Sequence, residues 1–201
     1  SLIEEGIEVK KTVLLIMILS IITKTIGFSR DILLSYFYGV SYISDAYLIS
    51  VTIPTVIVAF IGTGIATSFV PMYSNILKDR DIKSANLFTN NVINFVLIIC
   101  TVITIVVFIF TEPIVRLFAS GFEGEQFNLT VTFTKIGVFS VYFAGLIYIF
   151  TGYLQVKNKF TISALMGIPN NLIIMLSIVL SVNFSINILA FGTVIAMGFQ
   201  M

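Results

Sequence analysis

The chain has 201 residues, of which 58% are hydrophobic and 10% are charged, and its formal net charge is +1. Soluble domains carry about 25% charged residues, so this composition excludes a water-facing globular domain, and the balanced charges give no basic surplus for nucleic acid. The absence of histidine and the single cysteine, Cys100, exclude histidine metal sites, Ser-His or Cys-His catalysis and an internal disulfide, so we expect no enzyme and no cofactor.

The first predicted element is one long helix over about residues 11–39, preceded by a cytoplasmic tail of residues 1–10. Lys10 and Lys11 with the uncharged run 12–23 resemble a signal peptide, but no small-residue cleavage site follows and Lys24 comes instead. Apolar residues continue beyond Lys24, so we expect a helix interrupted by polar residues rather than a cleaved signal. The sequence begins at Ser1 without an initiator methionine, so we also expect a fragment of a longer protein.

Five further spans are predicted at about residues 46–77, 84–111, 127–156, 160–181 and 185–201, and Lys135 is the one charged residue within them. Residues 160–201 contain no charge and are too long for one crossing of about 20 residues. A polar patch divides them into two spans: Ser181, Asn183, Ser185 and Asn187. The predicted fold class is therefore an all-α polytopic membrane protein with six transmembrane helices in residues 11–201.

Helix breakers and small residues lie inside several of these spans. Pro54 is predicted to break the second span, together with Gly62 and Gly64, and Pro169 precedes two asparagines in the fifth. The small-residue steps Gly62 to Ala66 and Gly192 to Ala196 are typical of close contacts between membrane helices.

The basic residues of the predicted loops are distributed asymmetrically. Seven of them fall on one side of the membrane: Lys10, Lys11, Lys78, Arg80, Lys83, Lys157 and Lys159. The alternate loops hold only Arg116. Because basic loops face the cytoplasm, both ends of the chain are predicted to be cytoplasmic.

Three cations remain at membrane depth, namely Lys24, Arg30 and Lys135. Each costs about 2.5–3.5 kcal/mol at the bilayer centre, so it must face water, a partner or an anionic ligand. Lys24 lies about 20 Å beyond Lys11 along the helix, which is too far for it to reach back to the cytoplasmic surface. These cations are the main functional signal and predict a cavity for an anion.

Each charged residue also has a structural interpretation. Arg30, about 9 Å beyond Lys24, could anchor the helix at the outer interface. Asp31 lies seven residues after Lys24 and shares its face, so the two could form an ion pair. Asp45 could cap the second helix, and Lys135, about 13 Å into its span, could be satisfied by a partner within the bundle.

The order of several motifs resembles the MurJ/MviN family of lipid II flippases, within the multidrug/oligosaccharidyl-lipid/polysaccharide exporter superfamily. The motifs are Lys24-Thr-Ile-Gly27-Phe-Ser-Arg30-Asp31, Tyr38-Gly39, Ser44-Asp45-Ala46-Tyr47, Ile53-Pro54 and Ala66-Thr-Ser-Phe69-Val70-Pro71. The stretch from Gly152 to Phe160, continuing to Pro169-Asn-Asn171, looks like the family's fourth loop and fifth helix. The resemblance covers the chain from about Lys11 to its end, and its first third is the specific part.

The resemblance implies a fourteen-helix transporter of the bacterial inner membrane, of which this chain is the first of two six-helix lobes. Its central cationic cavity would bind the pyrophosphate of the lipid-linked cell-wall precursor. Lys24 and Arg30 stand at basic family positions, and Asp45 stands at an acidic one. Lys24 replaces an arginine found in many members, while Val58 and Thr63 stand where some members carry arginine and glutamate.

The predicted substrate-binding set is Lys24, Arg30, Asp31, Asp45 and Lys135. The expected partners are the lipid-linked precursor, membrane lipids and the C-terminal lobe of the same protein. Alternating access driven by the membrane potential needs no ATP site, and no P-loop motif is present. Two alternatives remain open, an exporter of another polyprenyl-linked polysaccharide or of a drug, and a non-transporting membrane scaffold for cell-wall enzymes.

Overall fold

A computed structural model describes the backbone of residues 2–201 and the side chains of residues 11–201. Within these residues all regular secondary structure is helical, which confirms the predicted all-α class. The helices are α1 (Leu2–Tyr38), α2 (Tyr42–Asp79), α3 (Ile82–Ile109), α4 (Thr111–Phe118), α5 (Gly124–Gly137), α6 (Ser140–Val156), α7 (Phe160–Leu165), α8 (Gly167–Asn183) and α9 (Ile188–Phe199). The first helix begins at Leu2, so its backbone includes most of the predicted tail of residues 1–10.

Four segments are long and apolar enough to cross a membrane: Lys11–Tyr38, Tyr42–Asp79, Ile82–Ile109 and Phe160–Asn183. The α5 and α6 helices are bent by 44° relative to each other and would form a fifth span together. With 12 residues, α9 is apolar but short. Large apolar side chains such as Leu14 and Ile98 are more than half exposed on the helix surfaces, as expected for contact with lipid. The chain is a membrane protein, and the number of six spans stays a prediction.

Short polar motifs set the ends of the first helices. Gly39, between α1 and α2, has φ +57°, a conformation that glycine adopts without steric cost. Ser41 caps α2, because its hydroxyl accepts a hydrogen bond from the Ser44 backbone N–H. At the start of α3, the Asp81 carboxylate accepts a hydrogen bond from the Ser84 backbone N–H at 2.8 Å. Hydrogen bonds from the side chain and the backbone of Ser84 lower the pKa of Asp81.

The bends of the helices differ from those predicted. The second span is not broken at Pro54, because α2 is continuous from Tyr42 to Asp79 through both Pro54 and Pro71. A proline in a helix removes one backbone hydrogen bond, yet α2 stays helical where it packs against α5 and α6. The unpredicted break lies at residues 138–139, between α5 and α6, where no proline occurs.

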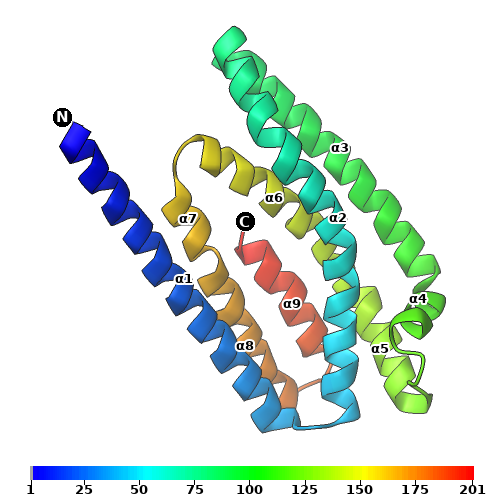
Figure 1. Cartoon of the computed structure of the whole chain (residues 1–201). Coiled ribbons are helices and arrows are strands. Elements are labelled where there is room, and N and C mark those ends of the chain that lie inside the picture. The colour runs from blue at the N-terminus through cyan, green and yellow to red at the C-terminus, as the bar shows by residue number, and fades with distance from the viewer. Residues whose placement is uncertain (1) are drawn as a thin grey trace.

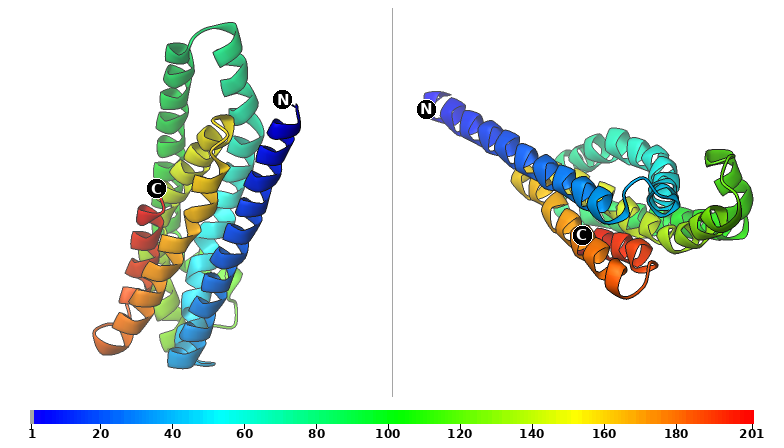
Figure 2. Two further views of the ribbon diagram at one scale, coloured as in Figure 1. Left: turned by 90° about the vertical axis from the view of Figure 1, so that its left-hand side faces the viewer. Right: turned by 90° about the horizontal axis from the view of Figure 1, so that it is seen from below.

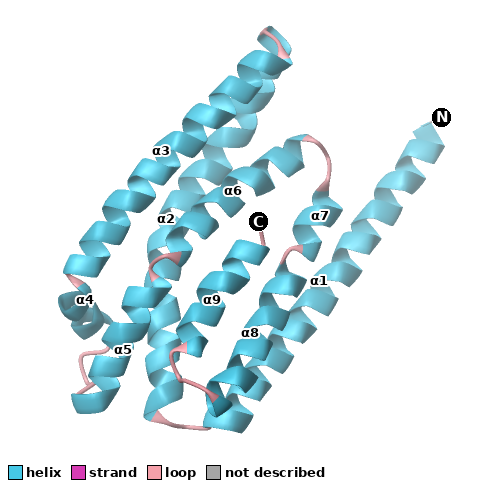
Figure 3. Cartoon of the chain, turned by 180° about the vertical axis from the view of Figure 1, so that it is seen from behind, coloured by secondary structure: helices cyan, strands magenta, loops and turns pink. Residues whose placement is uncertain are grey.

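The helices form two groups that meet mainly where α9 packs against α5 and α6 (Figure 1). On one side α1 packs against α7 and α8, and α9 lies beside α8; on the other side α2 packs against α5 and α6, with α3 outside them. The N-terminal end of α1 projects away from the other helices (Figure 2). Viewed from behind, short loops connect neighbouring helices at both ends of the bundle (Figure 3).

The short helix α4 occupies a stretch predicted to be a loop. Its Val115 is buried, whereas Leu117 is 81% exposed. The guanidinium of Arg116 lies 4.6 Å from the ring centroid of Phe127 in α5. This eight-residue helix is too short to give a clear periodic signal in the sequence.

Glycines bring pairs of helices into close contact. A Cβ atom added at Gly192 in α9 would lie 2.1 Å from the Cβ of Ser177 in α8, and one at Gly62 in α2 would lie 2.3 Å from the Tyr148 ring in α6. Both glycines begin the small-residue steps predicted from the sequence. Ala196 is also buried, whereas Ala66 is exposed. Both residues of the step from Gly192 to Ala196 are therefore packed, whereas only Gly62 is packed in the step from Gly62 to Ala66.

We expect Gly192→Val to destabilise the folded protein by about 1–3 kcal/mol, because the new side chain overlaps Ser177. The matched control is Gly64→Ala, since no heavy atom lies within 4 Å of a Cβ at Gly64. Thermal unfolding in mild detergent measures the difference. Equal melting temperatures for the two variants would contradict the close α8–α9 contact.

Candidate functional site

A pocket of about 290 Å³ lies between α1, α2, α8 and α9, and two charged residues of α1, Arg30 and Asp31, line it. Apolar side chains such as Leu34, Ile174 and Ile178 form much of the wall. The pocket therefore combines a charged rim with an apolar interior. Arg30 and Asp31 are two of the charged residues predicted from the sequence to bind the substrate.

The guanidinium of Arg30 makes three hydrogen bonds. Its Nε and Nη2 donate to Asp31 Oδ1 at 2.9 and 2.7 Å, and its Nη1 donates to Asn171 Oδ1 at 3.2 Å. Since a guanidinium has five N–H groups, one N–H on each terminal nitrogen remains without a partner among the described side chains. The Arg30 side chain is 32% exposed and that of Asp31 is 59% exposed. The site is thus reachable and can donate two more hydrogen bonds to an anion.

Two hydroxyl pairs join the helices around the pocket. Tyr47 of α2 and Thr193 of α9 share a hydrogen bond of 2.9 Å, and both line the pocket. Tyr38 at the end of α1 and Ser181 of α8 share one of 2.6 Å. Because these polar groups satisfy each other in an apolar environment, they hold the walls together without requiring a ligand.

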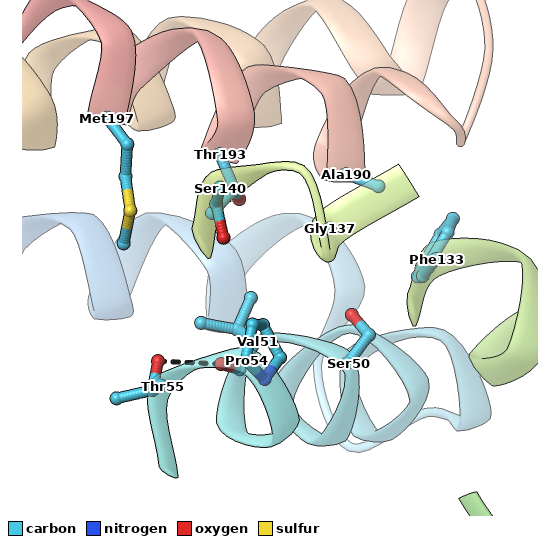
Figure 4. Close-up of a pocket in the computed structure, with 10 residues that line it drawn as sticks. All are labelled: Ser50, Val51, Pro54, Thr55, Phe133, Gly137, Ser140, Ala190, Thr193 and Met197. Carbon is cyan, nitrogen blue, oxygen red and sulfur yellow. Dashed lines mark hydrogen bonds between the residues drawn. The ribbon is translucent and has the colours of Figure 1, made fainter. Parts of the chain in front are cut away.

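A smaller pocket of about 10 Å³ adjoins the first and shares Val51, Thr55, Thr193 and Met197 with it (Figure 4). Pro54 lines it and has no N–H, so the carbonyl of Ser50 loses its helical hydrogen bond. Gly137 approaches that carbonyl closely, since a Cβ there would lie 3.5 Å from the Ser50 oxygen. This volume is sufficient for about one water molecule, so the larger pocket is the candidate ligand site.

Lys24 lies on α1 outside the residues that line the larger pocket. Its side chain is exposed, and among the described side chains it forms no ion pair with Asp31, which pairs with Arg30 instead. The seven-residue spacing still places Lys24 on the same helix face as Asp31, about 10 Å away along the axis. Lys24 therefore lies beyond the pocket, about a third of a turn around α1 from Arg30.

Asp45 and Lys135 lie apart from this pocket. Asp45 does not cap α2, because Ser41 does; its Oδ2 accepts a hydrogen bond from Gln126 Nε2 of α5 at 3.4 Å. The Lys135 ammonium lies 5.6 Å from the ring centroid of Phe108 in α3. Of the five predicted residues, the structure brings together Arg30 and Asp31 alone in the pocket.

Sequence reasoning identified Asn171 as part of a helix bend and missed its contact with Arg30. Asn171 is 7% exposed, and it follows Asn170, which lines the larger pocket. Two adjacent carboxamides in an otherwise apolar helix were a usable signal, since buried amides require hydrogen-bond partners. The identity of the partner could not be read from the sequence, because it lies 141 residues away.

Comparisons with known proteins point to one family. The family model for lipid II flippase MurJ matches residues 34–201. The lipid II flippase MurJ of Thermosipho africanus is 30% identical over 174 residues, which are 86% of this chain and 36% of that protein. A probable lipid II flippase MurJ of Buchnera aphidicola subsp. Acyrthosiphon pisum is 27% identical over 191 residues, 92% of this chain and 37% of that protein.

A solved structure of lipid II flippase MurJ in an inward closed conformation superposes with a TM-score of 0.80 at 28% sequence identity. The match covers 93% of this chain and 40% of that chain. The present chain thus spans well under half the length of these relatives.

We expect Lys135→Leu to leave both the amount of protein in the membrane and the affinity for inorganic pyrophosphate unchanged. The physical reason is that Lys135 lies against Phe108 and outside the pocket, and its loss removes an insertion cost. Binding to the purified protein checks this, with Arg30→Leu as the matched loss of an intramembrane cation. A large loss of affinity in Lys135→Leu would assign Lys135 to the site.

Proposed function

Because the chain belongs to the lipid II flippase MurJ family, we propose that it forms the first lobe of a transporter for lipid-linked peptidoglycan precursor. The transporter moves the precursor from the inner to the outer leaflet of the bacterial cytoplasmic membrane. The observation that carries the proposal is the Arg30 guanidinium, which lines an amphiphilic pocket and keeps two N–H donors without a partner among the described side chains.

The chemistry of Arg30 suits a pyrophosphate. Phosphate oxygens accept charge-assisted hydrogen bonds from a guanidinium, and these bonds are about twice as strong as neutral ones. Asp31 and Asn171 lower the cost of keeping Arg30 in an apolar environment while the pocket is empty. The two remaining N–H groups then bind the substrate without any loss of the existing contacts.

Lys24 contributes a second cation on α1, six residues before Arg30 and toward the predicted cytoplasmic side. Together with Arg30 it makes a cationic path for the polar head, while the lipid tail stays in the bilayer. Asp45 and Lys135 lie outside the pocket, and the proposal gives them no contact with the bound pyrophosphate. Rocking of this lobe against a second lobe supplies alternating access.

The membrane potential supplies a driving force for this anion. With the cytoplasm negative, outward movement of one negative charge gains about 2.3 kcal/mol per 100 mV. The protein therefore needs only to bind and release the head on opposite sides, and no covalent step is involved.

The proposed orientation predicts the accessibility of single cysteines in the full-length protein. Cysteines at Asp81 and Lys157 lie on the basic, cytoplasmic side, so an impermeant thiol reagent added to intact cells should not label them, whereas it should label one at Glu123. The native Cys100 is fully buried and gives little background. Labelling at Asp81 or Lys157 in sealed cells would reverse the orientation.

The binding role predicts the behaviour of the two cations of α1. Lys24→Ala and Arg30→Ala in the full-length transporter should each abolish precursor translocation while leaving the abundance of the inserted protein unchanged. Lys24→Arg should be tolerated, because it keeps the charge and supplies a fork that fits phosphate oxygens. Measurement of precursor in the outer leaflet, together with protein abundance, checks these outcomes.

The matched control for these variants is Lys83→Ala, which removes an exposed cation of the α2–α3 hairpin and should preserve translocation. An anchoring role for Lys24 and Arg30 predicts a different pattern, in which the alanine variants insert poorly. Normal translocation by both alanine variants would falsify the binding role.

A further inference from the structure

Asn171 is the one neutral side chain that forms a hydrogen bond with the Arg30 guanidinium within residues 11–201. Its Oδ1 accepts from Arg30 Nη1 at 3.2 Å, and its Nδ2 donates to the Gly167 carbonyl at 2.9 Å. Both ends of the carboxamide are therefore engaged. Because the amide has a donor side and an acceptor side, the bond to Gly167 fixes which side faces Arg30.

The packing of α1 against α8 also holds the carboxamide in place. A Cβ atom at Gly27, three residues before Arg30, would lie 3.6 Å from the Asn171 amide nitrogen. The side chain of Asn171 is 7% exposed, so it lies between the two helices with little room to change rotamer. Its orientation is set by α8 and not by the flexible arginine that it contacts.

We infer that Asn171 is a positioning residue for substrate binding, which rests on the proposed function of Arg30 as the contact to pyrophosphate. Asp31 binds the Nε and Nη2 positions of the guanidinium, and Asn171 binds Nη1. Contacts on both terminal nitrogens stop rotation of the guanidinium plane. The two remaining N–H groups are thereby held in a fixed direction before the substrate arrives, which lowers the ordering cost of binding.

The neighbouring Asn170 supplies a matched control within the same helix. It has the same side chain and, unlike Asn171, lines the larger pocket, but it forms no hydrogen bond with Arg30, and its Oδ1 is buried without a hydrogen-bond partner within residues 11–201. Removal of Asn171 alone changes the contacts of the guanidinium.

The test is a double-mutant cycle on the affinity of the full-length transporter, in lipid nanodiscs, for inorganic pyrophosphate. Asn171→Leu and Asn170→Leu are each measured with Arg30 present and with Arg30→Ala. We expect Asn171→Leu to weaken binding about tenfold or more when Arg30 is present, the size of a hydrogen bond to a charged group. With Arg30→Ala the same change should alter affinity by less than about twofold, because Asn171 acts only through Arg30. Independent effects would instead add and give the same loss of affinity in both backgrounds.

Asn170→Leu should change affinity by the same factor in both backgrounds, because Asn170 does not act through Arg30. Equal losses for Asn171→Leu in both backgrounds would show a merely structural role and overturn the inference. Weak binding by Arg30→Ala with full affinity in Asn171→Leu would overturn the positioning role alone. Full affinity in Arg30→Ala would contradict the proposed function, and the inference would fall with it.

Discussion

A guanidinium held inside an apolar helical lobe is the constraint on which the site depends. Arg30 costs free energy in the membrane unless its donors have partners, and it finds them on its own helix in Asp31 and across the bundle in Asn171. This requirement explains the close packing of α1 against α8. It also leaves the Arg30–Asp31 pair formally neutral while two N–H groups stay available, so the lobe can retain a cation at depth and still offer it to an anion.

The sequence predicted the helical class because apolar runs of this length have few other solutions. In the structure α8 ends at Asn183 and α9 begins at Ile188, so this break lies within the polar patch that follows Ser181. Breaks that depend on packing were not predictable. Proline suggested a broken α2, which is continuous, whereas the 44° bend between α5 and α6 follows Gly137, a single glycine that did not by itself predict a bend.

The candidate site was predictable in its residue types but not in its assembly. The cost of burying charge identified Lys24, Arg30 and Lys135 as functional candidates from depth alone. Which of them share a cavity depends on the rotation of each helix, and the structure points Lys135 at Phe108 while Arg30 lines the pocket. The oxygen that accepts a hydrogen bond from Arg30 belongs to Asn171, which lies 141 residues further along the chain. Helical spacing within α1 cannot reveal such a partner.

The central claim is that Arg30 binds the pyrophosphate of the lipid-linked precursor. An experimental structure of the full-length transporter with bound precursor measures it most directly, through the distance from the phosphate oxygens to the terminal nitrogens of Arg30. The account predicts oxygens at about 3 Å from those nitrogens, with the Asn171 contact retained. A pyrophosphate bound elsewhere, with Arg30 contacting only Asp31 and Asn171, would contradict it.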